Sequence, residues 1–254
     1  KSHAAAYAVG SYQTAFLKYY YPVEYMAALI SSVIDNPGKT GEYILNCRSM
    51  GIRMLSPDIN EGEADFTVSG DSIRYSLTAI KNVGRPIIDS IVKERKENGN
   101  FKSLQDFLER MLDTENATIN KRAVENFIKA GCMDSLGGNR RQYMQVYQII
   151  MDQAAKEKKG NISGQLSIFD MGEDVKKGFE VPLPKVEEFD KEELLGFEKE
   201  VLGIYVSGHP LEAYEELWRR KITNASADFF LQEDTNMAKV EDNAKVTVGG
   251  MIME

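Results

Sequence analysis

The chain has 254 residues, of which 43% are hydrophobic, and a formal net charge of −8 at pH 7. This length allows one large domain or two to three small ones, with enough apolar residues for hydrophobic cores. The acidic balance argues against a protein that coats nucleic acid over its whole surface, although it permits local basic patches.

Neither a membrane span nor a disulfide framework is expected. The sequence has no run of about 18 apolar residues. Its two cysteines, Cys47 and Cys132, lie far apart without a partner His or Cys nearby, so we expect them to be reduced and buried in a cytoplasmic protein. The abrupt start at Lys1 and a strand-like end suggest a piece of something larger.

Hydrophobic periodicity predicts a mainly α fold with one small β-hairpin. The hairpin is expected where two short alternating runs flank the turn Ser69-Gly70-Asp71. Residues 52–57 should be extended, and a truncated β segment is expected near Val246. The predicted helices cover residues 1–34 with a break at Pro22, 40–50, a stretch from Arg85 onward, 103–112, 120–130, 140–158, 191–201 and 211–220.

The most informative stretch is the turn between an apolar segment that ends at Ile80 and a helix that begins near Arg85. It holds an asparagine and a glycine, the residue types that best tolerate positive φ, and Pro86 suits a first helical turn. This pattern predicts a helix–hairpin–helix element. Free N–H groups at the positive end of a helix dipole suit a phosphate oxygen. The predicted DNA contacts are Lys81, Asn82, Val83, Gly84 and Arg85.

The surroundings of this turn are basic. Between Arg74 and Lys102 there are seven Lys or Arg residues and three Asp or Glu residues. Contacts to backbone phosphates would position nucleic acid without reading its sequence. An ordinary helical corner is the alternative, because Asn82 and Ile88 replace the glycine and the small residue that are common in such hairpins.

Residues 120–150 repeat this layout, with a glycine turn followed by a basic helix start at Arg140 and Arg141. Five basic and two acidic residues lie between Ile119 and Gln142. We interpret this stretch as the degenerate second half of a tandem pair, with Arg140 and Arg141 as further DNA contacts. A plain helical hairpin is the alternative.

The run from Gln165 to Phe169 matches a sliding-clamp-binding peptide: Gln, an aliphatic residue, any residue, an aliphatic residue, Phe. An extended peptide can place two apolar side chains in a pocket while the Gln amide forms directional hydrogen bonds. Because a five-residue pattern often arises by chance, a linker whose Phe packs on its own domain is the alternative. The predicted clamp contacts are Gln165, Leu166, Ile168 and Phe169.

Other chemistry-bearing residues are sparse. Lys1 and His3 lie near one helix face, and both residue types suit triphosphate oxygens. A lone histidine is more often structural, so these two residues alone leave the role unassigned. Asp58 is followed two positions later by an amide, Asn60, whereas phosphoryl transfer by two metals needs clustered acids. We therefore predict no catalytic residue and no metal site in this chain.

Together these segments resemble the bacterial DNA polymerase III alpha subunits, which are replicative polymerases of family C. The segments that carry the resemblance stand in the family's order and approximate spacing, at residues 1–7, 11–14, 55–60, 79–84, 130–136, 165–169 and 203–210. The resemblance implies the end of a fingers domain at 1–70, a tandem helix–hairpin–helix domain that binds clamp and DNA at 71–160, a clamp-peptide loop at 161–172, an acidic linker with helices at 173–238, and the start of an OB fold at 239–254.

The resemblance also implies partners: duplex DNA, the sliding clamp (the beta subunit) and other DNA polymerase III subunits. It places Lys1 and His3 toward the incoming nucleotide. The family's catalytic carboxylates and their Mg²⁺ lie in the palm, upstream of Lys1, so this chain alone is expected to be inactive and to hold no cofactor. A non-enzymatic DNA-binding adaptor that carries a clamp peptide is the alternative.

Overall fold

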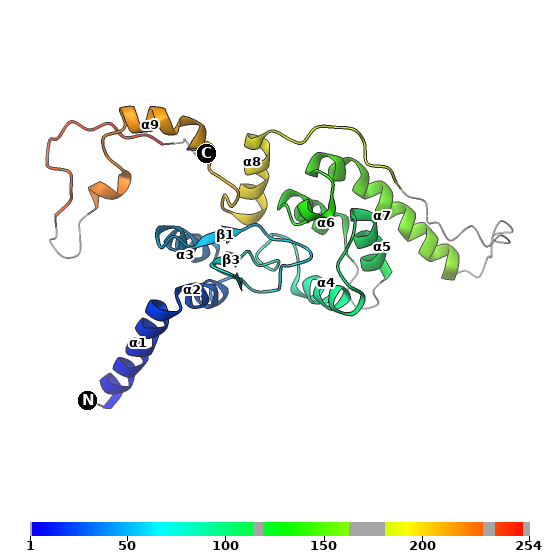
Figure 1. Ribbon diagram of the computed structural model, residues 1–254, viewed down its shortest axis with the longest axis horizontal. Coiled ribbons are helices and arrows are strands. Elements are labelled where there is room, and N and C mark those ends of the chain that lie inside the picture. Colours follow the sequence, from blue (N-terminus) through cyan, green and yellow to red (C-terminus); the bar gives the residue numbers. More distant parts are fainter. Residues whose placement is uncertain (1, 114–118, 163–180, 231–236, 251–254) are drawn as a thin grey trace. The chain divides into compact units, whose positions relative to one another are not determined.

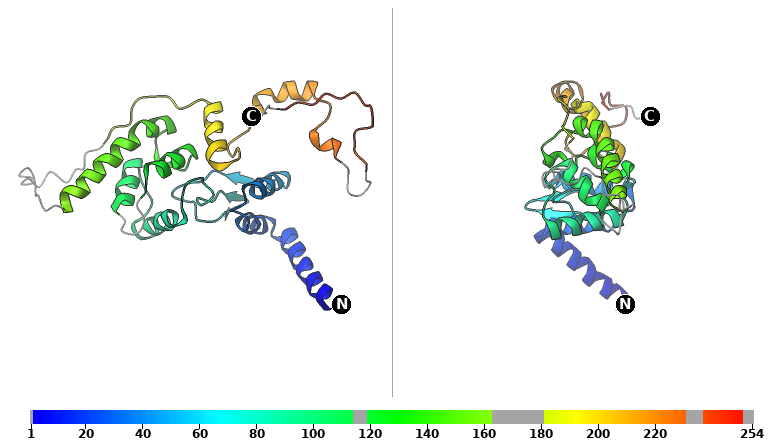
Figure 2. Two further views of the ribbon diagram at one scale, coloured as in Figure 1. Left: turned by 180° about the vertical axis from the view of Figure 1, so that it is seen from behind. Right: turned by 90° about the vertical axis from the view of Figure 1, so that its right-hand side faces the viewer.

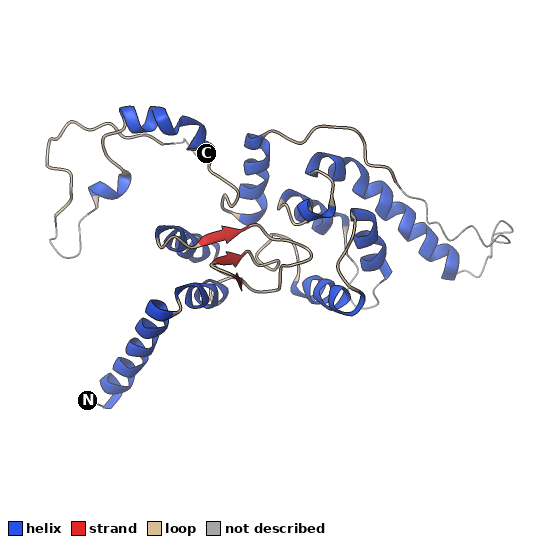
Figure 3. Cartoon of the chain, in the orientation of Figure 1, coloured by secondary structure: helices blue, strands red, loops and turns tan. Residues whose placement is uncertain are grey.

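The computed structural model describes residues 2–113, 119–162, 181–230 and 237–250, which fall into two compact units, 1–207 and 208–254. Helices dominate the first unit, and three short strands form its only sheet in the described residues (Figures 1 and 3). The mainly α class with a small β-hairpin is therefore confirmed.

Three helices open the first unit: α1 (Ser2–Tyr20), α2 (Pro22–Ser31) and α3 (Pro37–Ser49). The predicted break falls at Pro22, which occupies the first turn of α2 because its missing N–H costs nothing there. Asn36 caps α3 by accepting a hydrogen bond from the Lys39 N–H at 3.1 Å. Side chains of α2 and α3 enter the core, whereas those of α1 from Ala4 onward are exposed.

The sheet combines the predicted hairpin with a third strand. Strands β2 (Thr67–Ser69) and β3 (Ser72–Arg74) are antiparallel around a turn in which Gly70 has φ 59°. Strand β1 (Arg53–Leu55) pairs with β3 in parallel, with Met54 opposite Ile73. The sequence predicted the extended conformation of β1 but not its partner.

The other regular elements of the first unit are helices, whose ends differ by a few residues from the predicted ones. Ser103 and Asn120 accept hydrogen bonds from the first turns of two of these helices, at 3.1 and 2.9 Å. The elements are α4 (Arg85–Asn98), α5 (Leu104–Asp113), α6 (Lys121–Lys129), the 3₁₀ turn η1 (Asp134–Leu136), α7 (Arg140–Ile162) and α8 (Lys191–Leu202).

One hydrophobic cluster extends from Met26 to Leu202 and includes residues of the sheet and of α2 to α8. Cys47 and Cys132 are unpaired and fully buried, as predicted, and burial raises the pKa of the Cys47 thiol to about 11. Helix α8 packs on α6 and ends beside β3 (Figures 1 and 2). Helix α8, which comes late in the chain, thus packs beside the predicted hairpins.

The second unit holds η2 (Pro210–Tyr214), α9 (Glu215–Lys221) and η3 (Ser226–Phe229). His209 caps η2 by accepting the Leu211 N–H at 3.1 Å. The strand expected near Val246 is wrong for the described residues, which form no strand between 237 and 250. Thr247 instead exchanges hydrogen bonds with Thr223, and a strand requires a longer ladder.

Candidate nucleic-acid interface

The first predicted hairpin is a tight corner at the start of α4. Asn82 adopts φ 61°, the left-handed conformation that its residue type predicted. Gly84 is the N-cap residue, with extended φ −80° and ψ 147°, so it does not use the positive φ that glycine allows. Residues 77–82 form turns rather than a helix. The described element is therefore a turn followed by a helix.

Two backbone N–H groups at this corner remain available. Val83 was expected to offer a third, but its N–H donates to the Ile80 carbonyl at 3.3 Å and its side chain is buried. Gly84 and Arg85 are exposed, and within the described residues their N–H groups have no protein acceptor. Pro86 has no N–H. The candidate anion site is thus a pair of amides at the positive end of the α4 dipole.

Lys81 has a role within the fold that the sequence did not predict. Its backbone N–H donates to the Val201 carbonyl at 3.0 Å, and its ammonium group donates to the Glu200 carbonyl at 2.7 Å. The Tyr75 hydroxyl donates to the Leu202 carbonyl at 3.0 Å. These donors satisfy carbonyls that the last turn of α8 leaves unpaired. Lys81 therefore caps α8, and its assignment as a phosphate contact stays a prediction.

Intramolecular ion pairs also neutralise much of the basic surroundings. Glu63 pairs with Arg95 at 2.6 Å and with Lys96 at 3.4 Å, and Arg85 lies 3.6 Å from Asp65. Arg74 pairs with Glu61. These acids precede the stretch in which the basic residues were counted, so the local excess of positive charge is smaller than the sequence count suggested.

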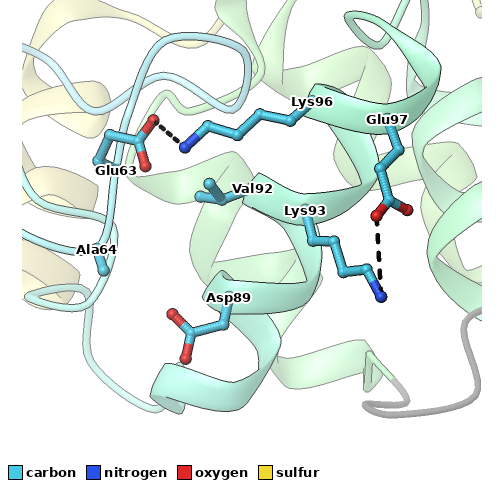
Figure 4. Close-up of a pocket in the computed structure, with 7 residues that line it drawn as sticks. All are labelled: Glu63, Ala64, Asp89, Val92, Lys93, Lys96 and Glu97. Carbon is cyan, nitrogen blue, oxygen red and sulfur yellow. Dashed lines mark ion pairs between the residues drawn. The ribbon is translucent and has the colours of Figure 1, made fainter.

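A pocket of about 380 Å³ lies beside α4 and carries both signs of charge. Figure 4 shows Lys96 directed toward Glu63 across its upper part and Lys93 paired with Glu97 at its side, with Asp89 below. A surface of mixed charge does not favour a phosphate chain. The pocket therefore does not extend the amide pair into a larger anion site.

The second hairpin buries its predicted contact. Arg140 is 5% exposed, and its guanidinium binds the Asp134 carboxylate at 2.8 Å and the Lys129 carbonyl at 3.1 Å. Fully buried Glu198 lies 3.9 Å away. Burial alone lowers the pKa of Arg140, but Asp134 and Glu198 outweigh it and raise the pKa. Arg140 thus holds α7, η1 and α8 together and does not present its charge to DNA.

Carboxylates and carbonyls of residues 184–193 occupy the start of α7. Glu188 accepts the backbone N–H groups of Arg140 and Arg141 at 2.8 and 3.1 Å. The Arg141 side chain, 38% exposed, pairs with Glu193 at 3.4 Å. Glu188 therefore already holds the first two amides of α7, and the N–H of Asn139, at the position of Gly84, donates to Gln142 Oε1 at 2.9 Å. The sequence count missed Glu188 because it lies 48 residues after Arg140.

The other predicted site residues lie beyond the described side chains. Lys1 and the whole run from Gln165 to Phe169 are outside the described residues, and His3 belongs to α1 without a described side chain. Among the described residues, no three His, Cys, Asp or Glu side chains gather to hold a metal ion. No described helix is both long enough and apolar enough to cross a membrane.

Sequence comparison first identifies the class of element. Residues 51–143 match a protein-family model described as a helix-hairpin-helix motif. This range begins just before β1, contains the corner at Gly84, and ends in the first turn of α7. The turns of both candidate hairpins and the starts of the helices that follow them therefore lie inside the matched region.

The chain is also similar to proteins named DNA polymerase III subunit alpha. It is 39% identical to that of Thermus aquaticus over 254 residues, which are 100% of this chain and 20% of the relative. The relative from Saccharopolyspora erythraea is 42% identical over 223 residues, or 85% and 18% of the two chains. The relative from Mycobacterium tuberculosis is 38% identical over 256 residues, or 99% and 21%.

The chain therefore spans about a fifth of the length of the curated relatives that it matches. Homology to DNA polymerase III alpha subunits, inferred from its sequence segments, is confirmed over nearly the whole chain. Where this piece lies within a complete alpha subunit stays a prediction.

Proposed function

We propose that the chain is the part of a bacterial DNA polymerase III alpha subunit that binds the backbone of duplex DNA and connects the polymerase to its sliding clamp. In this role it supports processive, template-directed DNA synthesis. The observation that carries the proposal is the open amide pair at Gly84 and Arg85, inside a helix-hairpin-helix match and a chain homologous throughout to alpha subunits.

The glycine at the corner supports a close approach by a ligand. Its φ of −80° suits any residue, and a Cβ atom at Gly84 would meet only the Pro86 Cδ, at an ordinary 3.6 Å. Neither backbone conformation nor packing requires glycine here. A bare backbone does allow a phosphate oxygen to reach the two N–H groups, which is a recurrent use of glycine.

The DNA proposal is tested by titrating the chain with duplex DNA over a range of salt concentrations. Arg85→Gln should reduce the log–log salt slope by about 0.9, the value for one phosphate contact. Gly84→Val should weaken binding without any charge change, because its side chain covers the amides. Lys93→Gln is the matched control on the same helix, since Lys93 pairs with Glu97 away from the corner. Equal slopes for all variants would refute the assignment.

The clamp tether is assigned to Gln165, Leu166, Ile168 and Phe169 on the sequence pattern alone. Gln165→Ala with Phe169→Ala should abolish binding to a purified sliding clamp, because the directional amide and the large apolar group are both lost. Ser167→Ala is the matched control at the position that the pattern leaves free. Undiminished clamp binding by the double variant would remove this part of the proposal.

The activity is assigned to the parent protein, a DNA-directed DNA polymerase of the bacterial cytoplasm that acts with other DNA polymerase III subunits. Its catalytic carboxylates and Mg²⁺ are assigned to a palm domain outside this chain, and Lys1 and His3 to the side of the incoming nucleotide. Primer extension by the 254-residue chain alone would contradict the assignment of catalysis to a separate palm domain.

A further inference from the structure

We propose that the second hairpin is a binding site for an extended acidic peptide, and that residues 184–193, named here the acidic strap, fill it and withhold it from DNA. This inference rests on the proposed DNA binding by the first hairpin. It assigns the chain's amide contacts with DNA to one hairpin, although the sequence contains two.

Glu188 occupies the place of a phosphate at the start of α7. Its two carboxylate oxygens accept separate hydrogen bonds, at 2.8 Å from the Arg140 N–H and at 3.1 Å from the Arg141 N–H. A carboxylate at a helix N-terminus gains from the same free donors and the same dipole that attract a phosphate. Both anions cannot bind these amides together, so the strap and DNA compete for them.

Side chains of the hairpin bind the backbone of the strap as well. Asn139 Nδ2 donates to the Val186 carbonyl at 2.9 Å, and Gln142 Nε2 donates to the Pro184 carbonyl at 2.8 Å. These bonds follow an extended stretch of chain that runs to the N-terminus of α8 (Figure 1). Recognition therefore covers a peptide backbone and not a single carboxylate.

The strap also neutralises Arg141, the partly exposed arginine at the start of α7. The Arg141 guanidinium pairs with Glu193 at 3.4 Å and lies over the Phe189 ring, 4.7 Å from its centroid. Farther along, Lys129 pairs with Glu200 of α8 at 2.8 Å. The three basic groups nearest the start of α7 are thus each matched by an acid: Arg141 and Lys129 by acids of residues 188–200, and Arg140 by Asp134.

The test compares two variants of the 254-residue chain with the same change in net charge. Glu188→Gln with Glu193→Gln removes both strap acids that contact the hairpin. Glu187→Gln with Glu192→Gln is the control, because both residues are exposed in the same segment. The contact variant should bind duplex DNA more tightly and gain about 0.9 in salt slope for each phosphate newly bound. Equal gains in both variants, or no gain in either, would overturn the proposal.

Backbone amide resonances separate this inference from the proposed function. On addition of duplex, the amides of Gly84 and Arg85 should shift in the wild type and in the contact variant. Those of Arg140 and Arg141 should shift only in the contact variant. Shifts at the first pair alone in both proteins would overturn the strap proposal, whereas no shift at the first pair would overturn the proposed function.

A single substitution keeps the proposal testable if the double variant does not fold. Glu193→Gln removes only the exposed ion pair with Arg141 and leaves Glu188 in place. It should increase the salt slope by at most about 0.9, the value for one phosphate contact. The Arg140 amide resonance should still not shift when duplex DNA is added. A full two-amide response from this variant would show that Glu188 does not exclude DNA.

Discussion

The two hairpins begin from similar sequence and end in different states. In each, a short turn with a residue at positive φ leads to a helix whose first residue is arginine. At the first hairpin the amides of Gly84 and Arg85 are open, and the arginine is exposed. At the second, Glu188 binds the amides of Arg140 and Arg141, and Arg140 is buried against Asp134.

This difference shows that local sequence determines the backbone conformation of the turn but not which anion binds to its N–H groups. Turn residues and helix propensity act over a few positions, so they place N–H donors correctly in both hairpins. Which anion then binds those donors depends on a segment that folds back from residues 184–202. The predictions below test whether this segment, rather than the hairpin sequence, makes the two halves unequal.

The largest expected effect is on the free energy of unfolding, and it distinguishes two neighbouring arginines of the second hairpin. Arg140→Met should lower the free energy of unfolding by about 3–5 kcal/mol, because it leaves Glu198 buried without a compensating charge. Arg141→Met should change it by less than about 1 kcal/mol, since its ion pair is exposed. Urea denaturation followed by circular dichroism measures both. Equal losses would mean that Arg140 is not the buried connection described above.

A smaller effect is expected at the corner of the first hairpin. Asn82→Val should cost about 1–2 kcal/mol, because a β-branched residue is strained at φ 61°. Asn82→Gly should be nearly neutral, since glycine reaches this conformation freely. The same denaturation experiment ranks the two variants. A tolerated valine would imply that the corner adopts another backbone conformation.

Much of the first unit followed from sequence because its signals are local. Pro22 marked a helix start, Gly70 a hairpin turn, and Asn82 the left-handed corner before α4. Periodicity placed the helices because burial of one face repeats every three to four residues. These features depend on neighbours in the chain, and the structure agrees with them.

What the sequence missed are contacts between residues that are distant in sequence. Lys81 lies 119 residues from Glu200, whose carbonyl it binds, and the charge count around it omitted Glu61 and Glu63. Hydrogen-bond partners so far apart leave no periodic pattern. The strand expected near Val246 shows the same limit, because a strand also requires partners, and within residues 237–250 no ladder forms.

The smallest expected effects distinguish the roles of Lys81 and Arg85. The sequence predicted both residues as DNA contacts. Lys81→Gln should destabilise α8 by about 0.3–1 kcal/mol, the range for a cation at a helix C-terminus, and should leave the salt slope of DNA binding unchanged. Arg85→Gln should do the reverse, with little loss of stability because its pair with Asp65 is exposed and 3.6 Å long. Hydrogen exchange of the last turn of α8 and a salt titration measure the two effects. If Lys81→Gln lowered the slope as much as Arg85→Gln, the ammonium group would have to leave α8 when DNA binds, and the first hairpin would be as dependent on that helix as the second.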